Sequence, residues 1–304
     1  MPSRETALFT DEFTGSILRK FKGVDLSSHY KRIGSGEGLH DAPAKLALFS
    51  VIDPGDVRQQ SLGDCWLLGS ISAVAEFRGL ISNLFKEREL SPRGEYTVFL
   101  FDLVSLSWKT YTIDNRLQTH PHNPSLLRFA DLSPEGEIWC PLLEKAFAVH
   151  AGGWDQINGG DSAVALACLT GCTDTVVIAN MSTTLNPSHF KYSMKQYDWE
   201  TFRGNSSKQA GRLLAHSGFN GQFGDASPDV LFDHLCEWDK KNFIMTAGTG
   251  GPNHPGNDDK SKDGIVDKHV YSVIAVKKQV CGKFDLICFR CPSCCAIIYV
   301  RILF

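Results

Sequence analysis

The chain has 304 residues, 42% of them hydrophobic, and a formal net charge of −3 at neutral pH. This length and composition predict one large domain or two subdomains with a sizeable core, and the charge gives no indication of nucleic-acid binding. No apolar run approaches the length of a transmembrane helix. The ten cysteines are irregularly spaced, and no signal-peptide region opens the sequence, so we expect a reducing, cytoplasmic location.

Residues 1–45 are predicted to form a loosely structured lead-in segment. Lys31–Asp41 is rich in glycine and charge, and Phe21–Leu26 offers only a short amphipathic stretch. An apolar run that includes Val51 follows, and then the sequence Asp53-Pro54-Gly55-Asp56, which is typical of a turn. Taken alone, Asp56 is interpreted as a turn carboxylate.

A helix is predicted to begin at Cys65. Asp64 is a favourable N-cap residue, and a helix N-terminus stabilises a thiolate, so this position favours a nucleophilic cysteine. Gln59, six residues upstream, carries an amide suited to bind a developing oxyanion together with the Cys65 N–H. The alternative is a buried core cysteine, against which the polar approach to the helix argues. The apolar residues at helical spacing are Leu67, Leu68, Ile71, Val74 and Ala75.

Two strands and a second helix are predicted next. Glu95–Val104 and Trp108–Ile113 are rich in β-branched and aromatic residues and are separated by a short hairpin connection. Glu137–His150 has an apolar helical face and ends before a Gly-Gly pair. His120 and His122 have the spacing of a metal-ligand pair, but no third ligand lies at a suitable spacing.

The second half of the chain is predicted to contain a helix over Val230–Asp239 and a strand over Asn242–Ala247. Thr201–Gly224 is polar and glycine-rich, and Gly248–Gly264 is expected to be a mobile loop. A β-rich run follows, with His269 at its first residue. An imidazole in this position is suited to accept the thiol proton of a nucleophilic cysteine and to protonate a leaving amine.

These segments resemble the calpain family of cysteine proteases. Gln59–Leu68 is similar to the family's active-site segment, in which a Gln precedes Leu-Gly-Asp-Cys-Trp-Leu-Leu. His269–Val273 is similar to the family's His-Ala-Tyr-Ser-Val strand. The resemblance extends over residues from about 46 to 292 and includes, in the family's order, Asp114–Leu117, Ile138–Ala148, Trp154–Gly160 and Leu169–Cys172.

The resemblance implies an α+β fold with a papain-like core of two subdomains. We expect a lead-in segment at 1–45, a nucleophile half at 46–176 and a β-rich half at 177–304. It implies that Cys65 is the nucleophile, His269 the general base and Gln59 the oxyanion donor of an endopeptidase that acts on polypeptides through a thioester. The family's third member is an Asn, and Cys291 stands at its position. A thiol is a poor acceptor for an imidazole N–H, so we expect weaker control of the His tautomer.

The resemblance also implies a calcium ion. The family's acidic ligands correspond to Asp56 and to Asp155, which replaces a glutamate, and a carbonyl oxygen is expected from Val51. We expect calcium to align the two halves and to take no part in the chemistry. The sequence contains no EF-hand loop, and it identifies no partner subunit.

The C-terminal end departs from the family pattern. Cys288, Cys291, Cys294 and Cys295 crowd together, so a zinc site or a lipidated tail is an alternative, but no second ligand pair has suitable spacing. We interpret Ala296–Phe304 as an altered or truncated end. Two other functions stay open: a non-catalytic calpain homologue that acts as a regulatory or scaffolding module, and another Cys–His acyl-transfer enzyme such as a transglutaminase.

Overall fold

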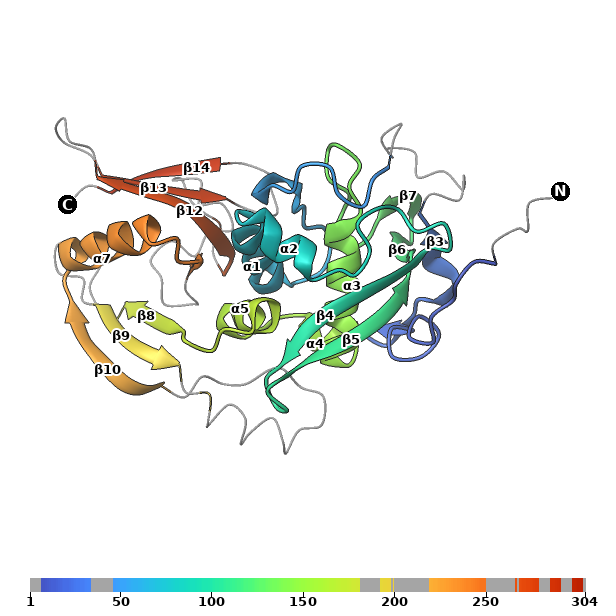
Figure 1. The fold of residues 1–304 in the computed structure, drawn as a ribbon, viewed down its shortest axis with the longest axis horizontal. Helices are drawn as coiled ribbons and strands as arrows, with labels where there is room; N and C mark the ends of the chain where they lie inside the picture. The colour runs from blue at the N-terminus through green and yellow to red at the C-terminus, as the bar shows by residue number, and fades with distance from the viewer. Residues whose placement is uncertain are drawn as a thin grey trace.

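The computed structural model describes residues 7–33, 46–180, 192–197, 199, 219–249, 266, 268–278, 285–290 and 297–302. Helices and strands are mixed, and the strands described form five separate sheets. This content agrees with the predicted α+β class. Figure 1 shows two groups of elements along the long axis of the molecule, with helix α1 between them.

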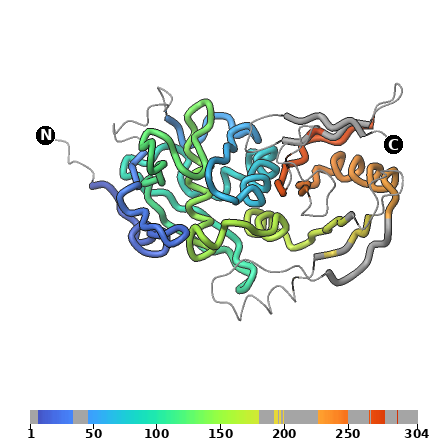
Figure 2. Tube along the Cα trace, turned by 180° about the vertical axis from the view of Figure 1, so that it is seen from behind, coloured from blue at the N-terminus to red at the C-terminus, as the bar shows by residue number. Residues whose placement is uncertain are grey.

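Helix α1 (Cys65–Ala75) occupies the centre of the structure. It begins at Cys65, as the sequence predicts, and every residue after Cys65 in the helix is buried. Figures 1 and 2 show the helix between β12 and α7 on one side and α3 on the other. Its direct neighbours are α3 (Trp139–Ala151), α5 (Ser162–Thr170) and β12 (Val270–Lys278).

The group of elements around α3 contains most of the hydrophobic core. Strands β4 (Glu95–Asp102) and β5 (Ser107–Asp114) form the predicted antiparallel hairpin. Helix α3 ends at Gly152, whose left-handed backbone (φ 93°) suits the predicted glycine stop. The other elements here are η2 (Pro54–Asp56), α2 (Arg78–Asn83), α4 (Trp154–Ile157) and a sheet of β3 (Tyr30–Arg32), β6 (Arg116–His120) and β7 (Asn123–Leu127).

The group of elements around β12 is built from two antiparallel sheets and helix α7 (Pro228–Lys240). The helix is longer than the predicted Val230–Asp239. It packs on the sheet through a small core of Phe232, Cys236, Val273 and Val276. The sheets have the orders β10-β9-β8 and β11-β12-β13-β14, and their strands are β8 (Val176–Asn180), β9 (Tyr192–Tyr197), β10 (Phe219–Ala226), β11 (Met245–Gly248), β13 (Asp285–Arg290) and β14 (Ile297–Ile302).

Part of the C-terminal tail forms a regular strand. Strand β14 pairs antiparallel with β13, with Ile297 opposite Arg290 and Ile302 opposite Asp285. The interpretation of this segment as an altered or truncated end is therefore incomplete, because its described residues complete the four-stranded sheet. An apolar, β-branched sequence is typical of such a strand.

The described part of the lead-in segment packs on the core and is not loose. It contains three short strands, one of which is β3, and a 3-10 turn, and four of its apolar side chains are buried in the main core. The elements are β1 (Lys20–Phe21), β2 (Val24–Asp25) and η1 (Ser27–His29), and the buried residues are Leu18, Phe21, Leu26 and Ile33.

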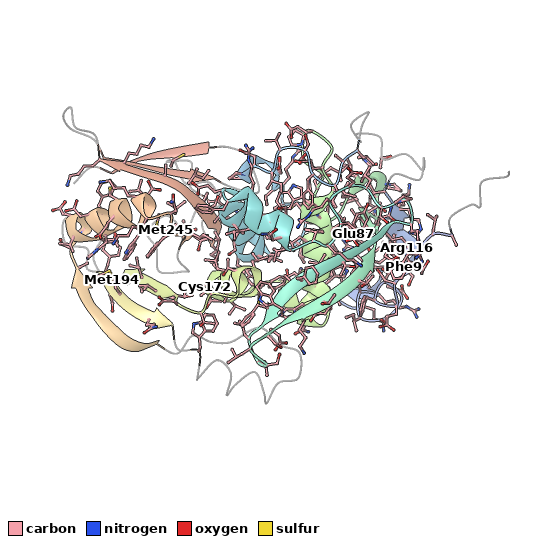
Figure 3. The ribbon with its side chains drawn as sticks, in the orientation of Figure 1. Phe9, Glu87, Arg116, Cys172, Met194 and Met245 are labelled. Carbon is pink, nitrogen blue, oxygen red and sulfur yellow. The ribbon has the colours of Figure 1, made fainter. Side chains whose placement is uncertain are left out.

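A buried ion cluster fastens this segment to α3. The Lys145 ammonium has no exposed surface and lies 2.8 Å from Asp11 Oδ2 and 2.8 Å from Asp114 Oδ1. The Arg116 guanidinium, labelled in Figure 3, closes the cluster from the other side at 2.6 Å from Asp114. The two carboxylates and two cations compensate one another, which a buried charge requires.

No helix in the described part of the chain has the length and apolar character needed to cross a bilayer.

We predict that Lys145→Met lowers the free energy of unfolding by about 3–5 kcal/mol, because it leaves two buried carboxylates without their central cation. Lys278→Met is the control, since the Lys278–Asp233 pair is exposed and its loss should cost less than about 1 kcal/mol. Urea denaturation of both variants measures the difference. Equal effects of the two substitutions would contradict a structural role for the cluster.

Candidate active site

The Cys65 thiol lies at the start of α1 and is half-buried. Backbone N–H groups of Cys65 and Trp66, at the first turn of the helix, point to the sulfur. A third N–H, from Val270, donates to the sulfur from the start of β12. The nucleophile predicted from the sequence therefore contacts the residue that follows His269.

The predicted effect of the helix terminus on Cys65 is outweighed by its surroundings. Burial and the nearby charge of Asp64 raise the pKa of the Cys65 thiol above its ordinary value, although the three N–H groups oppose this shift. The predicted N-cap bond is also absent: the Asp64 side chain caps no backbone N–H of α1 and is itself fully buried. The thiol is consequently protonated at neutral pH.

His269 lies immediately before β12 and is buried, with 7% of its surface exposed. Burial lowers the pKa of the imidazole, so the ring is neutral at neutral pH. The ring packs edge-to-face on Tyr271, with centroids 5.0 Å apart. The backbone is held by Thr249, which accepts from the His269 N–H at 3.0 Å and donates its own N–H to the His269 carbonyl at 2.9 Å.

Small side chains on α1 allow β12 to approach the helix closely. A Cβ atom on Gly69 would lie 2.9 Å from Val270 Cγ1 and 3.3 Å from the Val270 carbonyl oxygen. One helical turn further, the hydroxyl groups of Ser72 and Ser272 are hydrogen-bonded at 3.0 Å, and both residues are fully buried. This contact brings the Cys65 helix and the His269 strand together.

The Gln59 side chain is directed into the loop that precedes Cys65. Its Nε2 donates to the Leu62 carbonyl at 2.7 Å and to Asp64 Oδ1 at 3.2 Å. The Gln59 amide is therefore hydrogen-bonded to the loop that leads into Cys65, and its role as oxyanion donor stays a prediction.

Asn158 fixes the same loop from the side, and the sequence analysis missed it. Asn158 Oδ1 accepts from the Gly63 N–H at 3.2 Å, and the Gly159 N–H donates to the Gly63 carbonyl at 2.7 Å. The Trp66 indole lies against Gly160, where a Cβ atom would be 2.3 Å from the ring. This close approach explains why residue 160 is a glycine. The Asn-Gly-Gly sequence at 158–160 is the signal in the sequence that points to this loop.

Asp56 belongs to a cluster of three carboxylates. Oxygen atoms of Asp56, Glu135 and Glu137 lie within 4.8 Å of one another. Burial, followed by the proximity of Glu137, raises the pKa of Asp56 to about 7. The sequence analysis missed both glutamates; their spacing in Pro-Glu-Gly-Glu, just before α3, is the signal that pointed to them.

The other calcium ligands predicted from the sequence are Asp155 and Val51. Asp155 Oδ1 accepts from the Lys22 N–H at 2.8 Å, and Asp155 is not one of the three clustered carboxylates. The carbonyl oxygen predicted from Val51 stays a prediction; its neighbour Ser50 donates its N–H to Glu137 of the cluster.

Two further predictions concern Cys291 and the pair of His120 and His122. Cys291, at the position of the family's Asn, lies outside the described residues, as do Cys294 and Cys295. His120 and His122 are neighbours, with the His122 N–H donating to His120 Nδ1 at 3.3 Å, but neither belongs to the carboxylate cluster found among the described residues.

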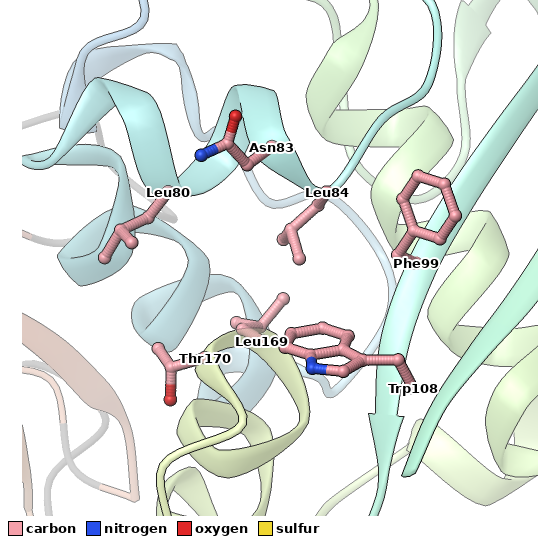
Figure 4. Close-up of a pocket in the computed structure, with 7 residues that line it drawn as sticks. All are labelled: Leu80, Asn83, Leu84, Phe99, Trp108, Leu169 and Thr170. Carbon is pink, nitrogen blue, oxygen red and sulfur yellow. The ribbon is translucent and has the colours of Figure 1, made fainter.

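A shallow apolar pocket of about 260 Å³ lies away from these residues. Figure 4 shows it between α2, the β4–β5 hairpin and the end of α5, with Trp108 forming one wall. None of the predicted site residues lines it.

Comparison with known proteins gives consistent matches. Residues 36–295 match the family described as "Calpain family cysteine protease". The calpain-type cysteine protease ADL1 of Oryza sativa subsp. japonica is 25% identical over 91% of this chain, and DEK1 of Arabidopsis thaliana is 26% identical over 91%. Calpain-10 of Rattus norvegicus is 34% identical over 38% of the chain. The chain spans only 10%, 11% and 18% of the lengths of these three relatives.

We predict that Gly69→Ala lowers the free energy of unfolding by about 1–3 kcal/mol, because the added methyl group overlaps the start of β12. The control is Gly79→Ala in α2, where a Cβ atom meets nothing within 4 Å and alanine should be neutral or stabilising by about 0.5–1 kcal/mol. Urea denaturation measures both. If Gly69→Ala were as stable as wild type, the close contact between α1 and β12 would be wrong.

Proposed function

Because the chain belongs to the calpain family of cysteine proteases, we propose that it is a calpain-like cysteine endopeptidase with Cys65 as nucleophile and His269 as general base. The observation that supports these roles best is the packing of α1 on β12, since the Val270 N–H contacts the Cys65 sulfur one residue beyond His269. Geometry of this kind is required for transfer of a proton between a thiol and an imidazole.

The proposed reaction begins from a neutral pair. The buried imidazole of His269 accepts the Cys65 proton as the sulfur attacks the substrate carbonyl carbon. The resulting oxyanion is bound by the Cys65 N–H and by Gln59, whose amide turns away from one of its loop acceptors. The imidazolium then protonates the leaving amine, the C–N bond breaks, and a thioester remains on Cys65. Water, activated by the neutral imidazole, hydrolyses the thioester and restores the thiol.

The proposed architecture is a papain-like core of two halves that bind an extended polypeptide between them. The halves would meet near residue 176, because α5 ends at Gly171 and strand β8 begins at Val176. In this division the first half carries Cys65 and the second carries His269.

Calcium regulation is proposed for the carboxylate cluster. Asp56, Glu135 and Glu137 together offer the hard oxygen ligands that calcium prefers. Burial, and then the proximity of Glu137, raise the pKa of Asp56, so a cation at this cluster would favour its ionised form. Glu137 also accepts from Ser50 N–H and Ser133 Oγ, so it fixes the site more than it supplies free ligand atoms. A bound calcium ion would neutralise this charge and hold the loop of Asp56 against the start of α3.

The proposed location is the cytoplasm, which rests on the irregular cysteine pattern. The proposed partner is a polypeptide substrate. This chain corresponds to a small part of its longer relatives. The peptidase activity is therefore proposed for the segment that matches them.

A second function is favoured by two observations. The raised pKa of the Cys65 thiol and the bound state of the Gln59 amide fit a calpain homologue that keeps the fold without turnover and acts as a regulatory or scaffolding module. The sequence supports the same alternative, since Cys291 replaces the family's Asn.

We predict that a thiol-reactive peptide probe labels Cys65 in the wild-type protein. Cys65→Ser should abolish labelling, and His269→Ala should slow it by about 10²–10⁴-fold, because general base catalysis is lost. Mass spectrometry of the labelled peptide identifies the site.

Cys172→Ser is the matched control, since Cys172 is an exposed thiol on no proposed catalytic element. Its labelling should equal that of wild type. If Cys65→Ser and His269→Ala were both labelled as fast as wild type, the non-catalytic homologue would be favoured.

We predict that Asp56→Asn and Glu135→Gln each weaken calcium binding by about tenfold or more, because each removes a charged ligand. Asp155→Asn should leave the affinity within about threefold, since Asp155 binds the Lys22 N–H and lies apart from the carboxylate cluster. Isothermal titration calorimetry with calcium alone measures all three. Loss of binding in Asp155→Asn with retention in Asp56→Asn would reverse the assignment.

A further inference from the structure

Two carboxyl groups are buried together at the start of the Cys65 helix, one on Asp64 just before α1 and one on Glu144 of α3. Asp64, the residue before the nucleophile, has no exposed surface, and Glu144 of α3 is 1% exposed. The two side chains are hydrogen-bonded to each other. Without a proton on Glu144, Asp64 Oδ2 has no hydrogen-bond donor among the described residues. A hydrogen bond between two carboxyl groups requires a proton on one of them.

No cation compensates this pair in the described residues. Glu144 accepts the Ala130 N–H on both oxygens, at 3.1 and 3.0 Å. The adjacent Lys145 points to Asp11 and Asp114. The other titratable groups near the pair are Cys65 and Cys140, with Asp56 acting on Cys140 from η2. All of these are neutral or acidic, so none of them favours two ionised carboxylates.

The electrostatics agree with a single retained proton. Burial raises the pKa of Asp64 to about 7. Burial, and then the charge of Asp64, raise the pKa of Glu144 well above its ordinary value. Both shifts favour a proton retained between the two carboxyl groups.

We propose that Asp64 and Glu144 share one proton, and that this carboxyl pair positions the Gln59 amide and limits the negative charge beside Cys65. Both are positioning residues, because they act through Gln59 and Cys65. The Gln59 part of this inference rests on the proposed peptidase function.

Two contacts connect the pair to the site. Asp64 Oδ1 accepts from Gln59 Nε2 at 3.2 Å, so the orientation of the carboxyl group sets the orientation of the amide. The charge of Asp64 also raises the pKa of the Cys65 thiol. With one proton retained between the two groups, only one negative charge opposes formation of the thiolate, whereas loss of that proton would place two there.

The test compares Glu144→Gln, Glu144→Ala and Asp64→Asn in the full chain. Glutamine keeps a donor toward Asp64 and an acceptor for the Ala130 N–H, so Glu144→Gln should retain kcat within about threefold of wild type. Glu144→Ala leaves Asp64 Oδ2 without a donor and should lower kcat by about tenfold or more with little change in KM. Thermal unfolding and circular dichroism establish that each variant is folded.

A second readout requires no peptide hydrolysis. The rate of Cys65 alkylation by iodoacetamide, followed by mass spectrometry across pH, reports the thiol pKa. Asp64→Asn should lower this pKa by about half a unit or more, because it removes the adjacent charge. Infrared spectra of the wild type should contain the C=O band of protonated carboxyl groups at neutral pH. Glu144→Gln should weaken this band, and the part that remains belongs to Asp56, whose pKa is raised to about 7.

The outcomes separate this inference from the proposed function. If the alkylation and infrared results hold while the wild type cleaves no peptide, the peptidase proposal fails and the shared proton stands. If the wild type is active but Glu144→Gln is as impaired as a folded Glu144→Ala, or Asp64→Asn leaves the alkylation profile unchanged, the shared-proton pair is wrong.

Discussion

The close contact between α1 and β12 is the constraint on which the rest of the structure depends. Elements distant in sequence supply the thiol and the imidazole, and only the absence of bulk on the helix face allows them to meet. Gly69 provides that space, and the Ser72–Ser272 hydrogen bond satisfies two hydroxyl groups that the contact buries. A larger residue at Gly69 would overlap Val270 and push β12 away from the helix that carries Cys65.

Burial at this contact has opposite effects on the two groups. It raises the pKa of the Cys65 thiol and lowers the pKa of the His269 imidazole, so both shifts favour the uncharged pair. A site of this kind begins with a thiol and a neutral base, and ionisation accompanies substrate attack instead of preceding it. The charge of Asp64 acts in the same direction, since it disfavours a resting thiolate.

Local patterns were sufficient to predict the elements that carry the chemistry. The Cys65 helix, the β4–β5 hairpin, α7 and the strand after His269 each have a periodicity that their own residues determine. The role of Asp64 was not predictable, because a residue type that favours an N-cap is here paired with Glu144 from another helix. The partners of Asp56 were missed for the same reason. Strands β9 and β10 were missed because pairing, and not apolar alternation, organises their largely polar sequences.

The Asp11–Lys145 ion pair makes the start of the chain part of the enzyme core. A polypeptide translated from a start codon downstream of residue 11, or one trimmed past it by self-cleavage, would keep Lys145 and Asp114 but lose the carboxylate that balances them. The remaining cluster would hold one carboxylate for two cations. Shortened chains of this kind would therefore fold less stably, although Cys65 and His269 would still be present.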